Sequence, residues 1–291
     1  MKKQLSPSEL ILNDDGSVYH LHILPEDLGE FVLTVGDPGR VATVSKFFDT
    51  IEVRKQKREF ITHTGTYKGK RITVLSTGIG TDNIDIAFNE LDALVNIDLK
   101  NRCVKEELTT LKIIRLGTSG ALHADLPPDS FVISEFGLGF DGLMNFYKIT
   151  PNEEEAAVLA EFNKQFGLAD SIAKLYLFAT SKTLVNLLGK DMFKGITATC
   201  SGFYAPQGRV LRYELAYPDL IDKISGFRNG NLRVTNFEME TSAMCGLARL
   251  LGHETCSVNA IVANRITGEF TSKAEETMDR MILTVLDRLT A

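Results

Sequence analysis

Short runs of β-branched and apolar residues alternate along this chain with stretches of helical periodicity, and this alternation limits the possible folds strongly. The runs predict strands at Phe31–Val35, Ile72–Ser76, Ile113–Leu116, Phe131–Ser134, Ile196–Cys200 and Val258–Ala263. Helical patterns lie between them at Val41–Phe48, Ile84–Val95, Glu153–Phe166, Ser181–Leu188 and Glu238–Leu251. A last helix carries the apolar stripe Met278, Met281, Ile282, Val285, Leu286 and Leu289. The alternation predicts an α/β fold with a central mixed sheet that helices cover on both faces.

The 291 residues contain no internal repeat, Pro-rich linker or break in composition. We therefore expect one domain over residues 1–291, with residues 1–17 as a flexible N-terminal extension. A hydrophobic fraction of 44% is enough for a sizeable core, and the net charge of −6 argues against a nucleic-acid surface. The four cysteines are scattered without metal-ligand spacing, which predicts no metal site. No stretch reaches the ~20 apolar residues of a membrane span, so we expect a cytoplasmic protein without a membrane partner.

Gly-rich segments follow three of the predicted strands: GDPGR at 36–40, TGIG at 77–80 and GTSG at 117–120. Ligands of α/β sheets lie beyond the carboxyl ends of the strands, and Gly-rich turns let backbone N–H groups approach an oxyanion. The dinucleotide pattern GxGxxG fails because Asn83 stands where its third glycine is needed, and no P-loop pattern occurs. The turns therefore indicate an anion other than a dinucleotide or a P-loop nucleotide.

Two arginines adjoin these turns. Arg40 ends the first turn, and Arg115 lies inside the apolar run IIRLG, directly before the third. Burying an arginine there is costly without an anionic partner. That partner is either a bound anion such as phosphate or a carboxylate in a structural salt bridge.

Further blocks extend the pattern, and in chain order they read GDPGR (36–40), KREF (57–60), STGIG (76–80), RLGTSG (115–120), FYAPQGR (203–209) and EMETS (238–242). With them the chain resembles the uridine phosphorylases of the nucleoside phosphorylase-I family, and the FYxxQxR block is typical of the uridine branch. The resemblance implies the single-domain fold of that family and reversible phosphorolysis of uridine to uracil and ribose 1-phosphate in pyrimidine salvage. It leaves deoxyuridine and thymidine open as further substrates. Orthophosphate is then the co-substrate.

The same resemblance assigns roles to residues of this sequence. It implies that phosphate is bound by Gly36, Arg40, Arg115 and Thr118. Arg58 of a neighbouring subunit would bind the same phosphate. Guanidinium forks suit this task because they match phosphate oxygens bidentately. It also implies that Glu240 binds the ribose and that Met239 packs under the sugar. His20 would contact the 5′-hydroxyl across a dimer interface. The active unit is therefore expected to be at least a homodimer with shared active sites.

The resemblance further implies that Gln207 and Arg209 bind the base and that Phe203 stacks on its ring. A glutamine amide complements the N3–H and a carbonyl of uracil, and Arg209 faces an oxygen where charge collects as the bond breaks. Arg115, Arg209 and Glu240 are thus the expected catalytic residues. The stretch 263–267 offers Arg265 and no acid that could protonate a purine, which favours a pyrimidine.

Two further expectations concern acidic residues. Glu238 and Glu240 are two positions apart at the start of a predicted helix, so they should not share one face. Some bacterial members of the family hold a monovalent cation between subunits with a glutamate, here Glu59, and a serine that Asn83 replaces in this chain. The cation stays an open possibility, and no other cofactor is implied.

Two other kinds of enzyme and a non-catalytic binding protein are the alternative interpretations of this sequence. A nucleosidase of the same fold would use water in place of phosphate and would not need Arg40 or Arg115. A calcium-dependent nucleoside hydrolase would need a clustered aspartate motif, which the sequence lacks. A non-catalytic nucleoside-binding protein is the alternative from another class, although residues for phosphate, ribose and base all occur.

Overall fold

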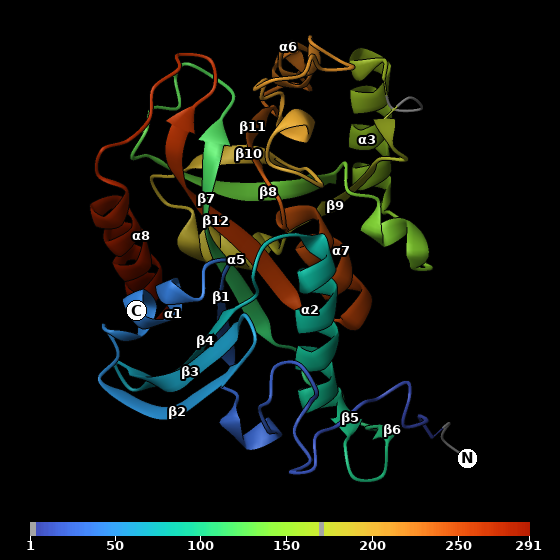
Figure 1. Ribbon diagram of the computed structural model, residues 1–291, viewed down its shortest axis with the longest axis vertical. Helices are drawn as coiled ribbons and strands as arrows, with labels where there is room; N and C mark the ends of the chain where they lie inside the picture. The colour runs from blue at the N-terminus through green and yellow to red at the C-terminus, as the bar shows by residue number, and fades with distance from the viewer. Residues whose placement is uncertain (1–3, 169–171) are drawn as a thin grey trace.

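The computed structural model describes residues 4–168 and 172–291, and its centre is one mixed sheet (Figure 1). The sheet contains β1 (Phe31–Val35), β2 (Thr50–Lys57), β3 (Phe60–Tyr67), β4 (Lys70–Ser76), β7 (Lys112–Ala121), β8 (Phe131–Gly139), β9 (Tyr176–Ala179), β10 (Phe193–Thr199), β11 (Val234–Glu238) and β12 (Glu254–Asn264). Its strand order is β11-β10-β8-β12-β7-β1-β4-β3-β2, and β9 pairs with β8. A separate two-stranded sheet joins β5 (Ile97–Asp98) and β6 (Cys103–Val104).

Every predicted strand overlaps an observed one, and the predicted α/β class is confirmed. The central strands run parallel: β1 pairs in parallel with both β4 and β7, and β12 pairs in parallel with β7. The antiparallel hairpin of β2 and β3 was not predicted. Its first strand reads TIEVRKQK and alternates exposed with half-buried residues at the edge of the sheet, so it lacks the apolar run that marks the central strands.

The sheet does not stay open along its whole width. Strand β11 pairs with β10 on one side and, antiparallel, with β7 on the other, through Asn236 opposite Ala121 and Phe237 opposite Gly120. The strands β7, β12, β8, β10 and β11 therefore close into a ring. This closure brings the second half of β11 beside the carboxyl end of β7, which local sequence patterns do not reveal.

The helices cover the sheet from several sides (Figure 1). They are α1 (Gly39–Ser45), α2 (Thr81–Asn96), α3 (Glu153–Phe166), α5 (Lys182–Leu188), α6 (Leu220–Gly226), α7 (Thr241–Leu251) and α8 (Ala274–Leu289). One apolar cluster lies between the sheet and helices α2 and α7, and a second packs α1, α5 and α8 against β1, β4, β7 and β12. A third joins α3 and α6 to β8, β9, β10 and β11. The whole predicted apolar stripe of α8 is buried.

Two local predictions were wrong. The segment GTSG is not a turn, because β7 continues through it to Ala121 and stays paired with β12. The helix predicted from Glu238 starts only at Thr241, because Glu238 still belongs to β11 and Glu240 precedes the first turn of α7. Neither glutamate lies on a helical face, so helical spacing does not keep them apart.

The N-terminal segment contacts the body of the protein at several residues. Leu10 is buried in the α2 cluster, the backbone N–H of Leu5 donates to the carbonyl of Arg102 at 2.8 Å, and Leu12 bridges to Val18. Residues 1–3 of the expected flexible extension lie outside the described residues. Among the helices that the structure describes, none combines the length and apolar character needed to cross a membrane.

Candidate active site

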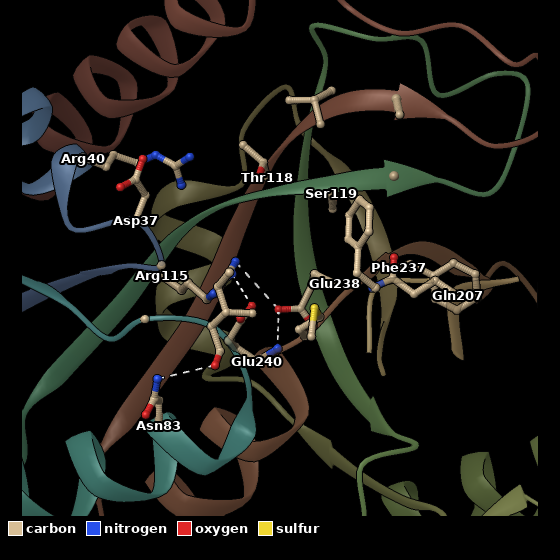
Figure 2. A pocket seen from close by; sticks show the side chains of 18 of the residues that line it. Asp37, Arg40, Asn83, Arg115, Thr118, Ser119, Gln207, Phe237, Glu238 and Glu240 are labelled. Carbon is tan, nitrogen blue, oxygen red and sulfur yellow. Dashed lines mark hydrogen bonds and ion pairs between the residues drawn. The ribbon is translucent and has the colours of Figure 1, made fainter. Parts of the chain in front are cut away.

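A cavity of about 580 Å³ opens at the carboxyl edge of the sheet, a size typical of small-molecule sites. Residues that follow β1, β4, β10 and β11 line it, together with Arg115, Thr118 and Ser119 of β7 and Phe270 before α8. Figure 2 shows Arg40, Asp37 and Thr118 on one side, Arg115 with Glu238 and Glu240 in the middle, and Phe237 and Gln207 on the other side. The cavity thus has a cationic end, a carboxylate centre and an aromatic and amide end.

The cationic end is built by the turn between β1 and α1. The Asp37 carboxylate accepts a hydrogen bond from the backbone N–H of Gly39 at 2.8 Å, which fixes the turn and places Arg40 at the second residue of α1. Burial, together with the nearby charge of Arg115, lowers the pKa of Arg40 from its ordinary value. Within the described residues the Arg40 guanidinium has no hydrogen-bonded or ion-paired partner. A half-buried, unpaired arginine in a cavity is ready to bind an anion.

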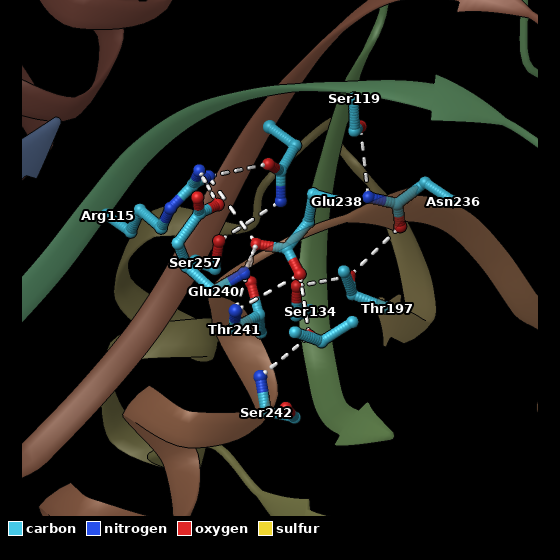
Figure 3. Close-up of polar contacts among 12 residues, drawn as sticks. Arg115, Ser119, Ser134, Thr197, Asn236, Glu238, Glu240, Thr241, Ser242 and Ser257 are labelled. Carbon is cyan, nitrogen blue, oxygen red and sulfur yellow. Dashed lines mark hydrogen bonds and ion pairs between the residues drawn. The ribbon is translucent and has the colours of Figure 1, made fainter. Parts of the chain in front are cut away.

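Arg115 is 5% exposed and lies among carboxylates (Figure 3). One guanidinium nitrogen, Nη2, pairs with the carboxylate of Glu240, and the other, Nη1, donates to Asn259 Oδ1 at 3.2 Å and lies 3.7 Å from Glu238 Oε2. The room for this side chain comes from Gly117, where a Cβ atom would stand 1.7 Å from Arg115 Nη1. Glycine is therefore needed at position 117 to leave space for the Arg115 side chain, and not to form a turn. A salt bridge to a carboxylate, one of the two partners considered for Arg115 from the sequence, is thus present, and both of its residues line the cavity.

The two glutamates meet at Arg115, contrary to the expectation from helical spacing. Glu240 also accepts a hydrogen bond at Oε1 from the backbone N–H of Gly80 at 2.9 Å, just before α2. Glu238 accepts from Thr199 Oγ1 at 2.7 Å and from the backbone N–H groups of Glu240 and Thr241. Burial raises the pKa of Glu238, with Arg115 opposing this effect and Glu240 adding to it. The site thus holds two carboxylates against one guanidinium.

The aromatic and amide end is built by the loop after β10. Arg209 lies over the Phe203 ring, with its guanidinium carbon 3.7 Å from the ring centroid, and it donates through Nη1 to Gln207 Oε1 at 2.8 Å. Arg265 donates to the carbonyl of Gln207 at 3.0 Å. Burial, with Arg265 nearby, lowers the pKa of Arg209 to about 10. An aromatic face with an adjacent amide and guanidinium suits a flat ring that carries oxygen atoms.

Most of the sequence-predicted site residues come together in this cavity. Those that line it are Gly36, Arg40, Arg115, Thr118, Phe203, Gln207, Arg209, Met239 and Glu240. His20 and Arg58 do not belong to the lining. His22, beside His20, lies 3.4 Å from Asp15 in an ion-pair contact, which agrees with a structural role.

Arg58 stands at the two-residue turn between β2 and β3, with a φ of 53°. This left-handed region is unusual for arginine, and glycine or asparagine is the common choice at such a turn. The next residue, Glu59, lines the cavity of its own chain, whereas Arg58 does not.

Sequence reasoning missed some residues of the cavity. Glu238 was treated only as a helix residue, although it lies within the EMETS block, and Ser119 was passed over between Thr118 and Gly120. The Ser119 hydroxyl oxygen accepts a hydrogen bond from Asn236 Nδ2 at 3.0 Å. Asn236 in turn is hydrogen-bonded to buried Thr197, and Thr197 to buried Ser134 (Figure 3). Phe270 joins the cavity from a segment without a motif, so no local signal could have found it.

A mixed α/β sheet whose carboxyl-edge cavity combines an unpaired arginine, paired carboxylates and an aromatic–amide loop is the arrangement of an enzyme that acts on small polar molecules. The family model described as the phosphorylase superfamily matches residues 30–287, and the chain belongs to this superfamily. The curated uridine phosphorylase of Thermococcus kodakarensis is 31% identical over 279 residues, which cover 95% of this chain and 88% of that relative. A DeoD-type purine nucleoside phosphorylase of Bacillus thuringiensis is 28% identical and covers 92% of this chain and 97% of its own.

Solved structures agree with this assignment. A Trypanosoma brucei nucleoside phosphorylase, described as showing uridine phosphorylase activity, has a TM-score of 0.87 and 28% identity, and the match covers 96% of this chain and 99% of that one. A purine nucleoside phosphorylase of Toxoplasma gondii shares the fold with a TM-score of 0.69, at 20% identity and 96% coverage of this chain and 99% of its own.

Proposed function

We propose that this protein is a uridine phosphorylase, which cleaves uridine with orthophosphate to give uracil and ribose 1-phosphate. The observation that carries the proposal is a single cavity in which an unpaired Arg40 lies at one end and Gln207 with Arg209 at the other. The distinction from purine enzymes rests on the second end, because the Gln207 amide and the Arg209 guanidinium complement the oxygens and N3–H of uracil. The similarity to uridine phosphorylases supports this assignment. A cytoplasmic location stays a prediction from the sequence.

At the cationic end, Gly36, Arg40, Arg115 and Thr118 would hold phosphate against the face of C1′ that lies opposite the base. A phosphate oxygen then forms a bond to C1′ while the bond between C1′ and N1 breaks. The electron pair of the broken bond moves into the uracil ring. The arginines neutralise the dianion and hold it in line with the breaking bond. At the other end, Arg209 stabilises the negative charge that collects on a uracil oxygen.

The ion pair between Arg115 and Glu240 has a task of its own in this mechanism. It holds two opposite charges in the cavity before substrates arrive, so neither stays buried and unpaired. The ribose 2′- and 3′-hydroxyls can donate to Glu240, and phosphate can accept from Arg115, so each substrate finds a preorganised partner. Glu238 remains near Arg115 and keeps the guanidinium in place.

The test is the release of uracil from uridine, measured with and without phosphate. The proposal expects release only when phosphate is present, with ribose 1-phosphate as the second product. Release in its absence would instead identify a nucleosidase, and binding of uridine without any release would identify a non-catalytic protein.

We further propose that two copies of the chain share their active sites, with His20 and Arg58 of each copy completing the cavity of the other. These two residues lie outside the cavity lining of their own chain, and the segments that carry them contact each other. Lys57, next to Arg58, donates to the carbonyl of Tyr19 at 2.6 Å, and the rings of His20 and Phe60 are 6.2 Å apart. Because these segments pack together, one two-fold contact would bring both side chains to the partner, since such a contact uses the same patch on both copies.

Mixing of variants tests the shared site. Arg58→Ala and Arg115→Ala proteins, each nearly inactive, should regain about a quarter of the wild-type activity when random dimers form, since half of the dimers then carry one intact site. The matched control mixes Arg40→Ala with Arg115→Ala, because both residues belong to the same chain's cavity and no intact site can form. A mixture of the first pair that stays inactive, although mixed dimers are isolated by two different tags, would place Arg58 outside the partner's site.

A further inference from the structure

The His20 side chain is held by a single acidic residue of α2. Glu90 Oε1 lies 2.7 Å from His20 Nδ1, and the same carboxylate accepts hydrogen bonds from the backbone N–H of His20 at 2.9 Å and of Leu21 at 2.8 Å. The imidazole is 25% exposed and the carboxylate 15% exposed. One carboxylate thus fixes both the backbone and the ring of this segment.

Aromatic rings limit the remaining freedom of the imidazole. Tyr19 packs edge-to-face against it at a centroid distance of 4.8 Å, and Phe60 does so at 6.2 Å. Lys57 in turn holds Tyr19 through the carbonyl hydrogen bond and by lying 4.0 Å from the centroid of the Tyr19 ring. The ring plane of His20 is therefore set before any ligand arrives.

The carboxylate also decides which nitrogen of His20 carries the proton. A carboxylate can only accept, so the proton of the neutral imidazole resides on Nδ1. Nε2 is left with its lone pair, and within the described parts of the chain it has no hydrogen-bonded partner. This nitrogen is an acceptor for a hydroxyl group.

We propose that Glu90 is a positioning residue for the cleavage of nucleosides, acting through His20 on the 5′-hydroxyl of the ribose in the partner's site. The inference rests on the proposed function and on the shared site. The 5′-hydroxyl donates its hydrogen to Nε2 of the neutral imidazole, and Glu90 holds the ring proton on Nδ1 and aims the ring. Glu90 itself touches no substrate.

The experiment compares uridine with 5′-deoxyuridine, which lacks the hydroxyl that His20 would accept from. In the wild type and in the Glu90→Gln, Glu90→Ala and His20→Ala variants, kcat/KM is measured for both nucleosides at saturating phosphate. His20→Ala should lower the rate on uridine by about tenfold, the weight of one hydrogen bond, and leave 5′-deoxyuridine nearly unchanged. Both Glu90 variants should show the same substrate-dependent loss, since glutamine keeps the shape but can donate to Nδ1 and move the ring proton to Nε2.

A second carboxylate–histidine pair on the same helix supplies the matched control. Asp92 Oδ1 lies 3.3 Å from His253 Nε2, outside the cavity, and Asp92→Asn should leave the ratio of the two nucleosides unchanged. Equal losses on both nucleosides in the Glu90 variants would show a merely structural role and overturn the inference. A substrate-dependent loss in His20→Ala without one in the Glu90 variants would also overturn it. No substrate dependence in His20→Ala would instead overturn the shared ribose contact of the proposed function.

Discussion

Replacement of Arg115 by alanine is expected to lower kcat/KM for phosphate-dependent uridine cleavage by about 10²–10³-fold, the usual cost of losing one preorganised charge contact. The guanidinium would be lost from the phosphate site, and Glu240 would lose the partner that holds it for the ribose hydroxyls. The measurement is the steady-state rate at varied phosphate and saturating uridine. An unchanged kcat/KM for phosphate would contradict the assignment.

The same substitution should also lower stability. It leaves Glu238 and Glu240 buried without their counter-charge, and breaking a buried pair typically costs about 3–5 kcal/mol. The pKa of Glu238, already raised by burial, should then rise further because Arg115 no longer opposes that effect. A raised pKa in the folded state means that the folded chain binds the proton more tightly. The stability deficit should therefore grow as the pH rises above about 4.3, the ordinary value for glutamate.

Two companion variants separate charge from position in this experiment. Arg40→Ala removes an unpaired guanidinium, so it should lose activity with little loss of stability. Gly117→Ala keeps both arginines but places a Cβ atom where Arg115 Nη1 lies, and a displacement of about 1 Å can cost about 10² in rate. Gly226→Ala is the control for the latter, since a Cβ atom there meets no other atom within 4 Å.

Inosine is expected to be cleaved at least about 10⁴-fold less efficiently than uridine, because a site built for one hydrogen-bonding edge leaves its buried polar groups unpaired with another ring. Gln207 is 3% exposed, so its amide does not regain water when a purine is bound. The measurement is kcat/KM for both nucleosides at the same phosphate concentration. Comparable turnover of inosine would show that the base end has been misread.

The structure strengthens this expectation at Asn264, in the stretch where a purine enzyme would need an acid. The Asn264 amide donates to the carbonyls of His123 and Leu126 and accepts from the backbone N–H groups of Ile266 and Thr267. It is therefore occupied in holding a turn and is not free to act on a base. As a control, Gln207→Leu should lower the rate on uridine much more than the residual rate on inosine.

The α/β class could be predicted from the sequence because the central strands are buried on both faces and read as continuous apolar runs. The stripe of α8 was visible for a similar reason, since one buried face repeats every three or four residues. Strand β2 escaped prediction because its side chains lie at an edge and need not be apolar. The closure of β11 onto β7 escaped because a pairing between positions 236 and 121 leaves no local pattern.

The residue types of the cavity could be listed from the sequence alone, because an arginine within an apolar strand requires an anionic partner and the ordered blocks bring further arginines, carboxylates and a glutamine. How these groups are paired depends on the folded chain. Glu238 and Glu240 meet at Arg115 because β11 ends before α7 begins and because the closed sheet brings β11 beside β7. Contacts between residues more than a hundred positions apart depend on this packing, and residue spacing along the chain cannot encode them.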